Sequence, residues 1–341
     1  QKYDGYMYTD PTTQFKVTPN HRVLVKGFTS GKQSIVRADE FKPSSDKRYI
    51  VGGNKVGSNL ELSDSFVKLL VAVQADGYLS KDCSAIVFTF VKERKVERLE
   101  MILQSLGVSY GKSSRHRKGR DEITIRVPSG CLALKVRDYL DTDKSFKHGL
   151  INLPYEQLVT FVNEVKHWDG YVCKNGDMVL DTSDKKSCEF LQTVASLVGY
   201  KTNYNCYEKS THFGVCTIHR VYISTKTLAV KSANKPLTVS QYSGFIGCVS
   251  VPSGLVLVKR NNSIVVSGNT VNAKKLGIPR DQAKSVSYML MYGGSAKRAQ
   301  TMLGCTLEEA EIIVEAYWDA VLPLKLLREA MVKKWEERDK K

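Results

Sequence analysis

An asparagine followed directly by a threonine, Asn269 and Thr270, stands at the end of an apolar stretch over residues 264–266. The side-chain amide of an asparagine can attack its own main-chain carbonyl, close a succinimide and break the peptide bond to the next residue. A threonine hydroxyl can hold an acyl group as an ester before that bond breaks. The pair therefore predicts a cleavable joint. The alternative is a plain turn, since Gly-Asn also favours turns.

A histidine with a threonine three residues before it, Thr18 and His21, follows a Pro-Asn turn and precedes a strand of alternating character. An imidazole in that place can donate a proton to a leaving amide, which is general-acid chemistry. A surface histidine is the alternative. A second strand-rich stretch, over residues 239–258, contains Cys248.

Two predicted helices end in the dipeptide Asp-Gly, over residues 66–77 and 155–170. Glycine is a common helix stop, so one such ending says little. The flanks repeat as well, because each Asp-Gly is followed by a tyrosine, a strand, a further helix and another glycine. This order predicts two matching halves within residues 61–232.

A basic segment over residues 111–120 lies inside the first half. It holds five cationic residues and no acid: Lys112, Arg115, Arg117, Lys118 and Arg120. Of the net charge of +16, residues 270–341 carry +3, which leaves +13 for residues 1–269. An anionic partner is expected on that side of the joint, and the segment is predicted to contact phosphates or a groove of DNA rather than to be only a solvated hairpin tip.

A stripe of four residues spaced by four, on one side of a predicted helix, marks the C-terminal part: Arg280, Lys284, Tyr288 and Tyr292, followed by Gly293. Pro279 suits the N-terminus of that helix. An exposed helix face is the alternative on spacing alone. Further on, Thr306 and Glu309 form a predicted capping box that opens another helix.

The composition, with 42% hydrophobic residues over 341 residues, predicts a folded chain of two or three domains. No apolar run reaches the length of a membrane span. The eight cysteines form no Cys-x-x-Cys pair, so a structural zinc site is not expected and a reduced cytosolic setting fits. The chain opens at Gln1 without an initiator methionine or a signal peptide, which predicts a fragment of something longer.

The block at Thr18 and His21 resembles the Thr-x-x-His block of inteins, the self-splicing Hint fold. Residues 243–255 resemble the penultimate intein block, and residues 263–270 resemble intein C-termini. The resemblance implies that the histidine and threonine polarise an upstream scissile bond, that Asn269 cyclises, and that Thr270 begins a downstream host protein.

Two departures from the intein pattern bear on this expectation. Gly268 stands where the family has a histidine, so the proton donor must come from elsewhere, or the step is slow. Cys248 stands where the family often has an aspartate or a cysteine, so the resemblance makes it a candidate helper of asparagine cyclisation, with a buried structural thiol as the alternative. No cysteine or serine lies among the 17 residues before Thr18, so the upstream nucleophile is missing. A split intein or a truncated sequence, with an N-terminal intein and polymerase segment as partner, is therefore expected.

The twin Asp-Gly helices resemble the LAGLIDADG homing endonucleases, in which two signature helices pack together and each delivers an acid to a divalent metal. The resemblance implies that Asp76 and Asp169 hold Mg²⁺, which suits hard oxygen ligands and activates water for cutting double-stranded DNA. The second helix departs from the pattern at Glu164, Lys166 and His167. Either that face turns outward or the second half has decayed.

The run over residues 278–293 resembles motif B of family A DNA polymerases, Arg-x3-Lys-x7-Tyr-Gly. The resemblance implies that Arg280 and Lys284 grip the triphosphate of an incoming dNTP, while Tyr288 and Tyr292 face the sugar and the template base. Primer-template would be the second partner of the complete polymerase. The catalytic aspartates of such an enzyme lie outside this chain, so the segment alone cannot polymerise DNA.

The expected fold is therefore multi-domain. An all-β Hint domain (1–60 and 233–269) is split by an α+β pseudo-symmetric LAGLIDADG endonuclease (61–232), and an α-helical polymerase fingers fragment (270–341) follows. The expected function is intein splicing of a polymerase with endonuclease homing, in the cytoplasm of a bacterial or phage-infected cell. The rivals are an unspliced polymerase fragment with a DNA-binding insertion, and a basic nucleic-acid-binding module without chemistry.

Overall fold

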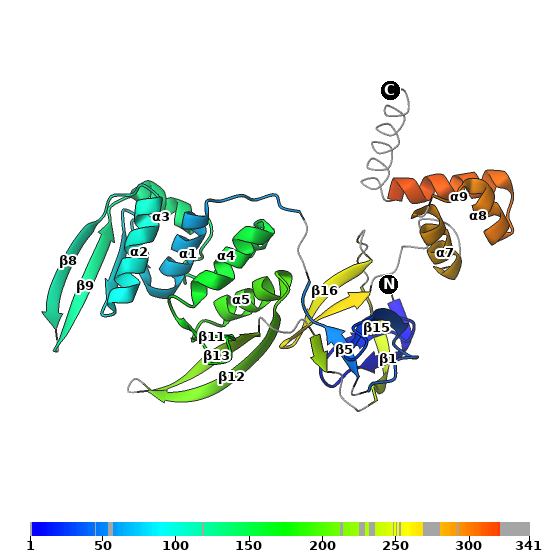
Figure 1. Ribbon diagram of the computed structural model, residues 1–341, viewed down its shortest axis with the longest axis horizontal. Coiled ribbons are helices and arrows are strands. Elements are labelled where there is room, and N and C mark those ends of the chain that lie inside the picture. The colour runs from blue at the N-terminus through cyan, green and yellow to red at the C-terminus, as the bar shows by residue number, and fades with distance from the viewer. Residues whose placement is uncertain are drawn as a thin grey trace, which may run out of the picture.

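The computed structural model describes residues 2–44, 46–53, 57–117, 119–211, 214–224, 229–231, 236–247, 249, 251, 254–268, 280–291 and 293–320. Over these residues the chain forms a central unit of helices on two sheets, a β-rich unit and a small group of helices near the C-terminus (Figure 1). No helix in these ranges is long and apolar enough to cross a membrane.

The central unit consists of two halves with the same sheet topology. The first contains α1 (Asp64–Asp76), β6 (Gly77–Leu79), β7 (Ile86–Phe90), α2 (Glu93–Ser105), β8 (Gly111–Arg117) and β9 (Arg120–Val127). The second contains α4 (Tyr155–Val165), β10 (Gly170–Val172), β11 (Met178–Thr182), α5 (Lys185–Leu197), β12 (Lys201–Thr211) and β13 (Gly214–Ser224). Their strand orders, β6-β7-β9-β8 and β10-β11-β13-β12, are the same path. Between the halves lie α3 (Gly130–Arg137) and a 3-10 turn, η1 (His148–Asn152).

The helix α1 is the core of the central unit. The hydroxyl of Ser63 accepts a hydrogen bond from the Phe66 amide at 3.2 Å and caps the helix. From Phe66 to Val73 all but one of its residues are buried, because α4 and α2 pack on it and the sheets cover the rest. A helix that is apolar on nearly all sides is stable only in such surroundings.

A glycine follows each of the two aspartates at a point of close backbone packing. A β-carbon on Gly77 would lie 2.7 Å from the Val73 Cα, and one on Gly170 would lie 3.0 Å from the Val165 carbonyl oxygen. Only glycine permits this approach, and it lets the chain leave the helical segment directly into β6 or β10. The two Asp-Gly dipeptides differ in one respect: the first ends α1, whereas α4 ends at Val165 and a turn over 166–169 precedes Gly170, so the helix expected over 155–170 is shorter than predicted.

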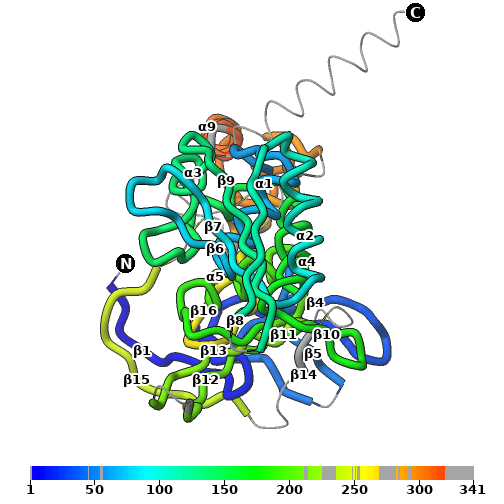
Figure 2. The backbone as a smooth tube through the Cα atoms, turned by 90° about the vertical axis from the view of Figure 1, so that its left-hand side faces the viewer, coloured from blue at the N-terminus to red at the C-terminus, as the bar shows by residue number. Residues whose placement is uncertain are grey.

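The β-rich unit is built from two segments of the chain, one before the central unit in sequence and one after it. One sheet has the order β15-β1-β2, with β1 (Lys2–Thr9), β2 (Lys16–Val17) and β15 (Thr238–Phe245), and the long β1 and β15 run side by side (Figure 2). The other has the order β14-β5-β3-β17-β16, with β4 on β3: β3 (Arg22–Gly27), β4 (Gln33–Arg37), β5 (Lys47–Ile50), β14 (Ala229–Lys231), β16 (Leu255–Arg260) and β17 (Ser263–Gly268). Between the sheets Tyr49 is fully buried and donates a hydrogen bond to Asp10 at 2.9 Å.

Polar contacts of α5 join the two units. The Gly53 amide donates to the Ser196 carbonyl at 3.0 Å, and the buried Gln192 side chain donates to the Asn262 carbonyl at 2.9 Å. A β-carbon on Gly52 would lie 2.8 Å from the carbonyl carbon of Gly199, so the two backbones touch there.

Three helices form the C-terminal group: α7 (Arg280–Met291), α8 (Ala296–Leu303) and α9 (Leu307–Ala320). Val286, Leu290 and Tyr317 belong to a small core of their own. The predicted capping box is confirmed, because the Thr306 amide donates to the Glu309 carboxylate at 2.9 Å and the Glu309 amide donates to the Thr306 hydroxyl at 3.2 Å.

The expected fold class is wrong. The described chain is a mixed α/β structure with four separate antiparallel sheets and eight α-helices, in place of an all-β Hint domain, an endonuclease and polymerase fingers in series. One physical reason is that β14, which lies inside residues 61–232, pairs with β5 of the β-rich unit. The domain boundaries expected from the sequence stay a prediction.

Candidate functional site

Two aspartates from the two halves meet at one lysine. Asp76 ends α1, Asp169 follows α4, and Lys95 is in the first turn of α2. The Lys95 ammonium lies 2.5 Å from Asp76 Oδ2 and 3.5 Å from Asp169 Oδ1. Its side chain is only 11% exposed, so the cation is held by the two carboxylates rather than by water. The structure therefore brings together two acids that are distant in sequence.

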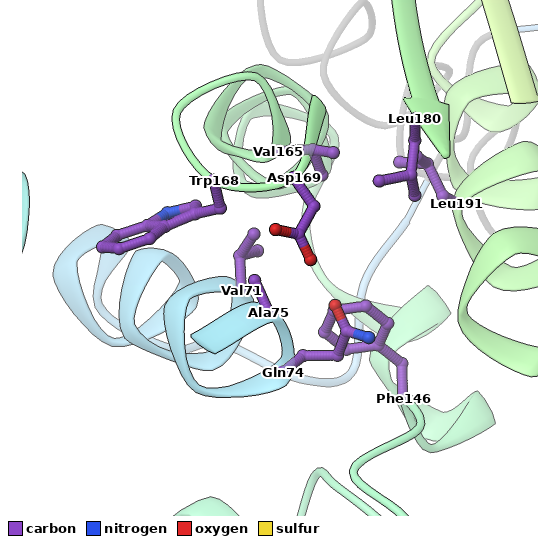
Figure 3. A pocket seen from close by; sticks show the side chains of 9 residues that line it. All are labelled: Val71, Gln74, Ala75, Phe146, Val165, Trp168, Asp169, Leu180 and Leu191. Carbon is purple, nitrogen blue, oxygen red and sulfur yellow. The ribbon is translucent and has the colours of Figure 1, made fainter. Parts of the chain in front are cut away.

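Asp169 also lines a small pocket between the helices. Figure 3 shows its carboxylate in the space between its own segment and α1, with one oxygen toward Gln74 of α1. Burial and the charge of Asp76 raise the pKa of Asp169, although Lys95 acts in the opposite direction. Two carboxylates that repel each other in a partly buried place favour a bound cation.

A second lysine faces the same acids from the segment between the halves. Lys144 has a positive φ of 66°, and its ammonium donates to the Gly77 carbonyl at 2.9 Å. Burial lowers the pKa of Lys144, while the charges of Asp76 and Asp169 oppose that shift. Sequence reasoning missed this residue, because a single lysine in a polar loop carries no signal of its position.

Glu164 of the second helix does not turn outward, whereas Lys166 and His167 lie beyond the end of α4 and are partly exposed. Glu164 is 1% exposed and accepts a hydrogen bond from Arg98 Nε at 3.0 Å and from Trp168 Nε1 at 2.9 Å, and a second guanidinium nitrogen of Arg98 also contacts it. Arg94 donates to the carbonyl of His167 at 2.6 Å. Of the three residues that depart from the apolar pattern, Glu164 is thus compensated by Arg98, while Arg94 contacts only the main chain of His167.

The donor set of the two aspartates suits a hard divalent cation. Magnesium is commonly bound by one or two carboxylates, with water and substrate phosphates completing its shell. Among the described residues no group of three or more histidines, cysteines and acids gathers at one place, so this pair could supply only part of such a shell. The Lys95 ammonium already contacts both acids, so a divalent cation would have to take its place between them.

The basic segment forms the hairpin of β8 and β9, and every residue of β8 is exposed. Lys112 pairs with Glu100 at 3.0 Å and Arg115 pairs with Glu122 at 2.8 Å. Arg117 and Arg120 are directly opposite each other at the tip, and in the part of the chain that the structure describes neither makes an ion pair. Lys118 lies outside the described residues.

His21 contacts a serine that the sequence did not single out. Its Nε2 lies 2.7 Å from Ser267 Oγ, which joins the start of β3 to the end of β17. The Thr18 hydroxyl donates to the side chain of Asn20 at 2.9 Å, so it is turned to its own loop. The predicted residues Cys248, Asn269 and Thr270 lie outside the described residues.

The C-terminal stripe is only partly described. Helix α7 carries Lys284 and Tyr288 and begins at Arg280, and Gly293 follows with a positive φ of 82°. Tyr288 is 41% exposed. Tyr292 and the side chains of Arg280 and Lys284 lie outside what is described, so the nucleotide-binding roles stay a prediction.

Comparison with known proteins gives one curated relative and several solved structures. The ribonucleoside-diphosphate reductase subunit beta of Aquifex aeolicus (strain VF5) is 23% identical over 306 residues, which cover 78% of this chain and 43% of the relative. The chain thus spans less than half of that relative's length. No protein-family model matches the chain.

The similar solved structures include LAGLIDADG proteins. The N-terminal LAGLIDADG domain of DUF199/WhiA is 12% identical, with 48% of this chain and 75% of that chain covered and a TM-score of 0.33. The homing endonuclease I-DmoI in complex with DNA and Ca is 14% identical, with 48% and 84% covered and a TM-score of 0.34. I-DmoI has also been crystallised with Mn. At these values no functional residue is carried over from them.

The curated relative overturns the expected identity. It is a reductase subunit and not a DNA polymerase, so the assignment to an intein that interrupts a family A polymerase is wrong. The splicing function, the enzyme class and the homing role that depended on this assignment are wrong with it. The polymerase partners and the missing upstream segment have no support among the relatives.

Proposed function

We propose that the central unit is a double-stranded-DNA-binding module with a divalent-cation site at Asp76 and Asp169. The observation that carries the proposal is the shared contact of both carboxylates with Lys95, at the meeting point of two halves of equal topology. A bound cation would neutralise the two acids and offer its free coordination positions to phosphate oxygens. Lys95 and Lys144 would add positive charge toward the same anion.

The basic face of the first sheet supports DNA as the partner. Directly opposite residues of antiparallel strands share a face, so Arg115, Arg117, Arg120 and Arg126 lie on the same side of the β8–β9 hairpin and β9. The buried Ile125 and Val127 alternate with them and face the helices. Glu122 is the acid on the arginine face, which leaves that face net positive. Such a surface suits the phosphate backbone of a duplex.

The cation site is tested by Mn²⁺ titration, followed by electron paramagnetic resonance of the free ion. Asp76→Asn and Asp169→Asn should each weaken Mn²⁺ binding at least tenfold, because one carboxylate of two is removed. Asp82→Asn is a matched control, since Asp82 lies on the turn after β6 and its carboxylate contacts Ser84. Equal Mn²⁺ affinity of the native chain, the two site variants and the control would refute the proposed metal site.

DNA binding is tested by fluorescence anisotropy of a labelled duplex over a series of KCl concentrations. The triple variant Arg115→Ser, Arg117→Ser, Arg120→Ser should reduce the slope of log K against log salt by about 3, at about 0.9 for each phosphate that is no longer neutralised. A control that removes three cations from the C-terminal helices is Lys297→Ser, Arg298→Ser, Lys284→Ser. A slope that the hairpin substitutions leave unchanged would refute the role of the hairpin.

A further inference from the structure

Lys95 lies at the point where a divalent cation would bridge Asp76 and Asp169. Its ammonium is 2.5 Å from Asp76 Oδ2 and 3.5 Å from Asp169 Oδ1. Carboxylate oxygens of this kind are the ligands that a hard divalent cation takes from a protein. Two cations cannot share one position, and their charges repel each other. The lysine and a divalent cation therefore compete for the two acids.

The formal charges around the two acids already cancel. Lys144 donates a hydrogen bond at 2.9 Å to the carbonyl of Gly77, the residue after Asp76, and brings a second ammonium beside the pair. Two aspartates and two lysines together carry no net formal charge. A divalent cation added to this group would leave it with an excess of positive charge. Its binding is therefore opposed unless an ammonium leaves or an anion enters.

The position of Lys95 in its helix makes it the ammonium that can leave. It is in the first turn of α2, close to the main-chain amides that give a helix N-terminus a partial positive charge. The cap residue, Lys92, makes no side-chain hydrogen bond to these amides. The helix thus disfavours an ammonium here, and the two acids hold it. A lysine stem is flexible, so the ammonium can turn away without movement of the main chain.

Solvent reaches the two carboxylates more easily than the ammonium between them. The side chains of Asp169 and Asp76 are 40% and 24% exposed, against 11% for Lys95. A divalent cation can therefore approach the acids from their exposed side while the lysine is still in place. The displaced ammonium needs a new anion, and in the proposed function that anion is a phosphate of the duplex.

We propose that Lys95 is a built-in counter-cation that keeps divalent cations off Asp76 and Asp169 until a duplex is bound. The inference rests on the proposed function, because it concerns the loading of the same site. A phosphate of the duplex draws the ammonium away from the acids and leaves them to the divalent cation. Duplex and divalent cation then each increase the affinity of the chain for the other by the same factor.

The first test is a titration of the full chain with Mn²⁺ alone, in which the free ion is followed by electron paramagnetic resonance. Lys95→Met should bind Mn²⁺ about tenfold more tightly than the native chain, within the range of about 5–150-fold that is usual for coupled sites. Lys95→Gln should do the same, because it removes the charge but keeps a polar side chain, which separates the loss of charge from misfolding. Lys92→Met is the matched control, since it removes the same charge from an exposed position at the same end of α2.

The second test repeats the titration with a saturating duplex, after subtraction of the Mn²⁺ that the duplex binds by itself. The duplex should increase the Mn²⁺ affinity of the native chain and of Lys92→Met. The increase should be smaller in Lys95→Met and Lys95→Gln, because the competing ammonium that the duplex draws away is already absent.

The outcomes separate this inference from the proposed function. Mn²⁺ affinity that is unchanged or weaker in both Lys95 variants would overturn the inference, and the metal site would stand if Asp76→Asn and Asp169→Asn still weaken binding. An equal effect of the duplex on the native chain and on both Lys95 variants would also overturn it. If the two aspartate variants bind Mn²⁺ as the native chain does, the metal site and the inference fail together.

Discussion

Replacing Arg98 by methionine should remove the compensation of a buried charge beside the candidate site. Glu164 is 1% exposed, and its carboxylate is held by the Arg98 guanidinium and the Trp168 indole. The arginine side chain is 24% exposed, so water reaches the guanidinium but not the carboxylate. Methionine keeps much of the volume and cannot donate a hydrogen bond.

The expected magnitude follows from the burial of the carboxylate. Breaking a buried pair by removing one partner costs about 3–5 kcal/mol, because an uncompensated charge remains. That cost is a large part of the free energy of unfolding of a folded domain, which is ~5–15 kcal/mol. The double variant Arg98→Met with Glu164→Leu removes both charges and leaves the Trp168 N–H without its acceptor, which costs about 1–3 kcal/mol. The double variant should therefore be more stable than the single one.

The assay is urea unfolding followed by far-ultraviolet circular dichroism, with the unfolding free energies of the native chain and both variants compared. A midpoint shift at constant m value measures stability alone. Arg98→Lys is the control, since it retains one charge-assisted hydrogen bond. If Arg98→Met lowers the unfolding free energy by less than about 1 kcal/mol, the carboxylate is not dependent on Arg98, contrary to the expected cost of a broken buried pair.

Two other predictions concern the second aspartate and the end of β17. Burial and the charge of Asp76 raise the pKa of Asp169 in the folded chain above the ordinary 3.8. The folded state therefore binds the proton more tightly than the unfolded state, and the free energy of unfolding decreases as the pH rises from 3.8 through the raised pKa. Asp169→Asn should therefore raise the thermal midpoint at pH 7, and this gain should vanish below pH 3.8, where the acid is protonated in both states; an equal gain at both pH values would contradict the assigned cause. Gly268→His should destabilise the β-rich unit by about 1–3 kcal/mol by overpacking, since its β-carbon would lie 2.3 Å from the Arg22 Cβ. Gly247→His is the control, because a β-carbon on Gly247 would have no atom within 4 Å. Equal thermal midpoints for the two variants would show that the Arg22 side chain moves aside without cost.

Local signals in the sequence predicted the elements of the central unit well. The end of α1 at Asp76 and Gly77 and the repeated order of helix and strand are short-range features with a local physical cause, although α4 ends at Val165, before its Asp-Gly. The meeting of Asp76 and Asp169 followed from the repeat rather than from either residue alone. The surroundings of Gly268 could not be predicted from the sequence, because Arg22, whose Cβ would lie 2.3 Å from a β-carbon at position 268, comes from a distant strand.

The identity of the chain could not be read from the same signals. A resemblance built from short blocks, such as Thr18 with His21, fixes only a few residues, and His21 is in fact bonded to Ser267, 246 positions away. The registers that join β1 to β15 and β3 to β17 depend on strands separated by the entire central unit. Such pairings arise from tertiary packing, which local patterns do not encode.

The contacts of α2 explain why the polar residues at the end of the second helix could not be interpreted from the sequence. Its residues Arg94, Lys95 and Arg98 look like an ordinary charged surface, because their partners His167, Asp169 and Glu164 stand 66 to 74 positions later in the chain. Taken alone, Glu164 in an apolar helix suggests decay of the repeat. Taken with Arg98 it is one half of a buried pair. Lys95, Arg94 and Arg98 are thus three contacts of one helix with the end of another, and they hold in place the turn that presents Asp169 to Asp76.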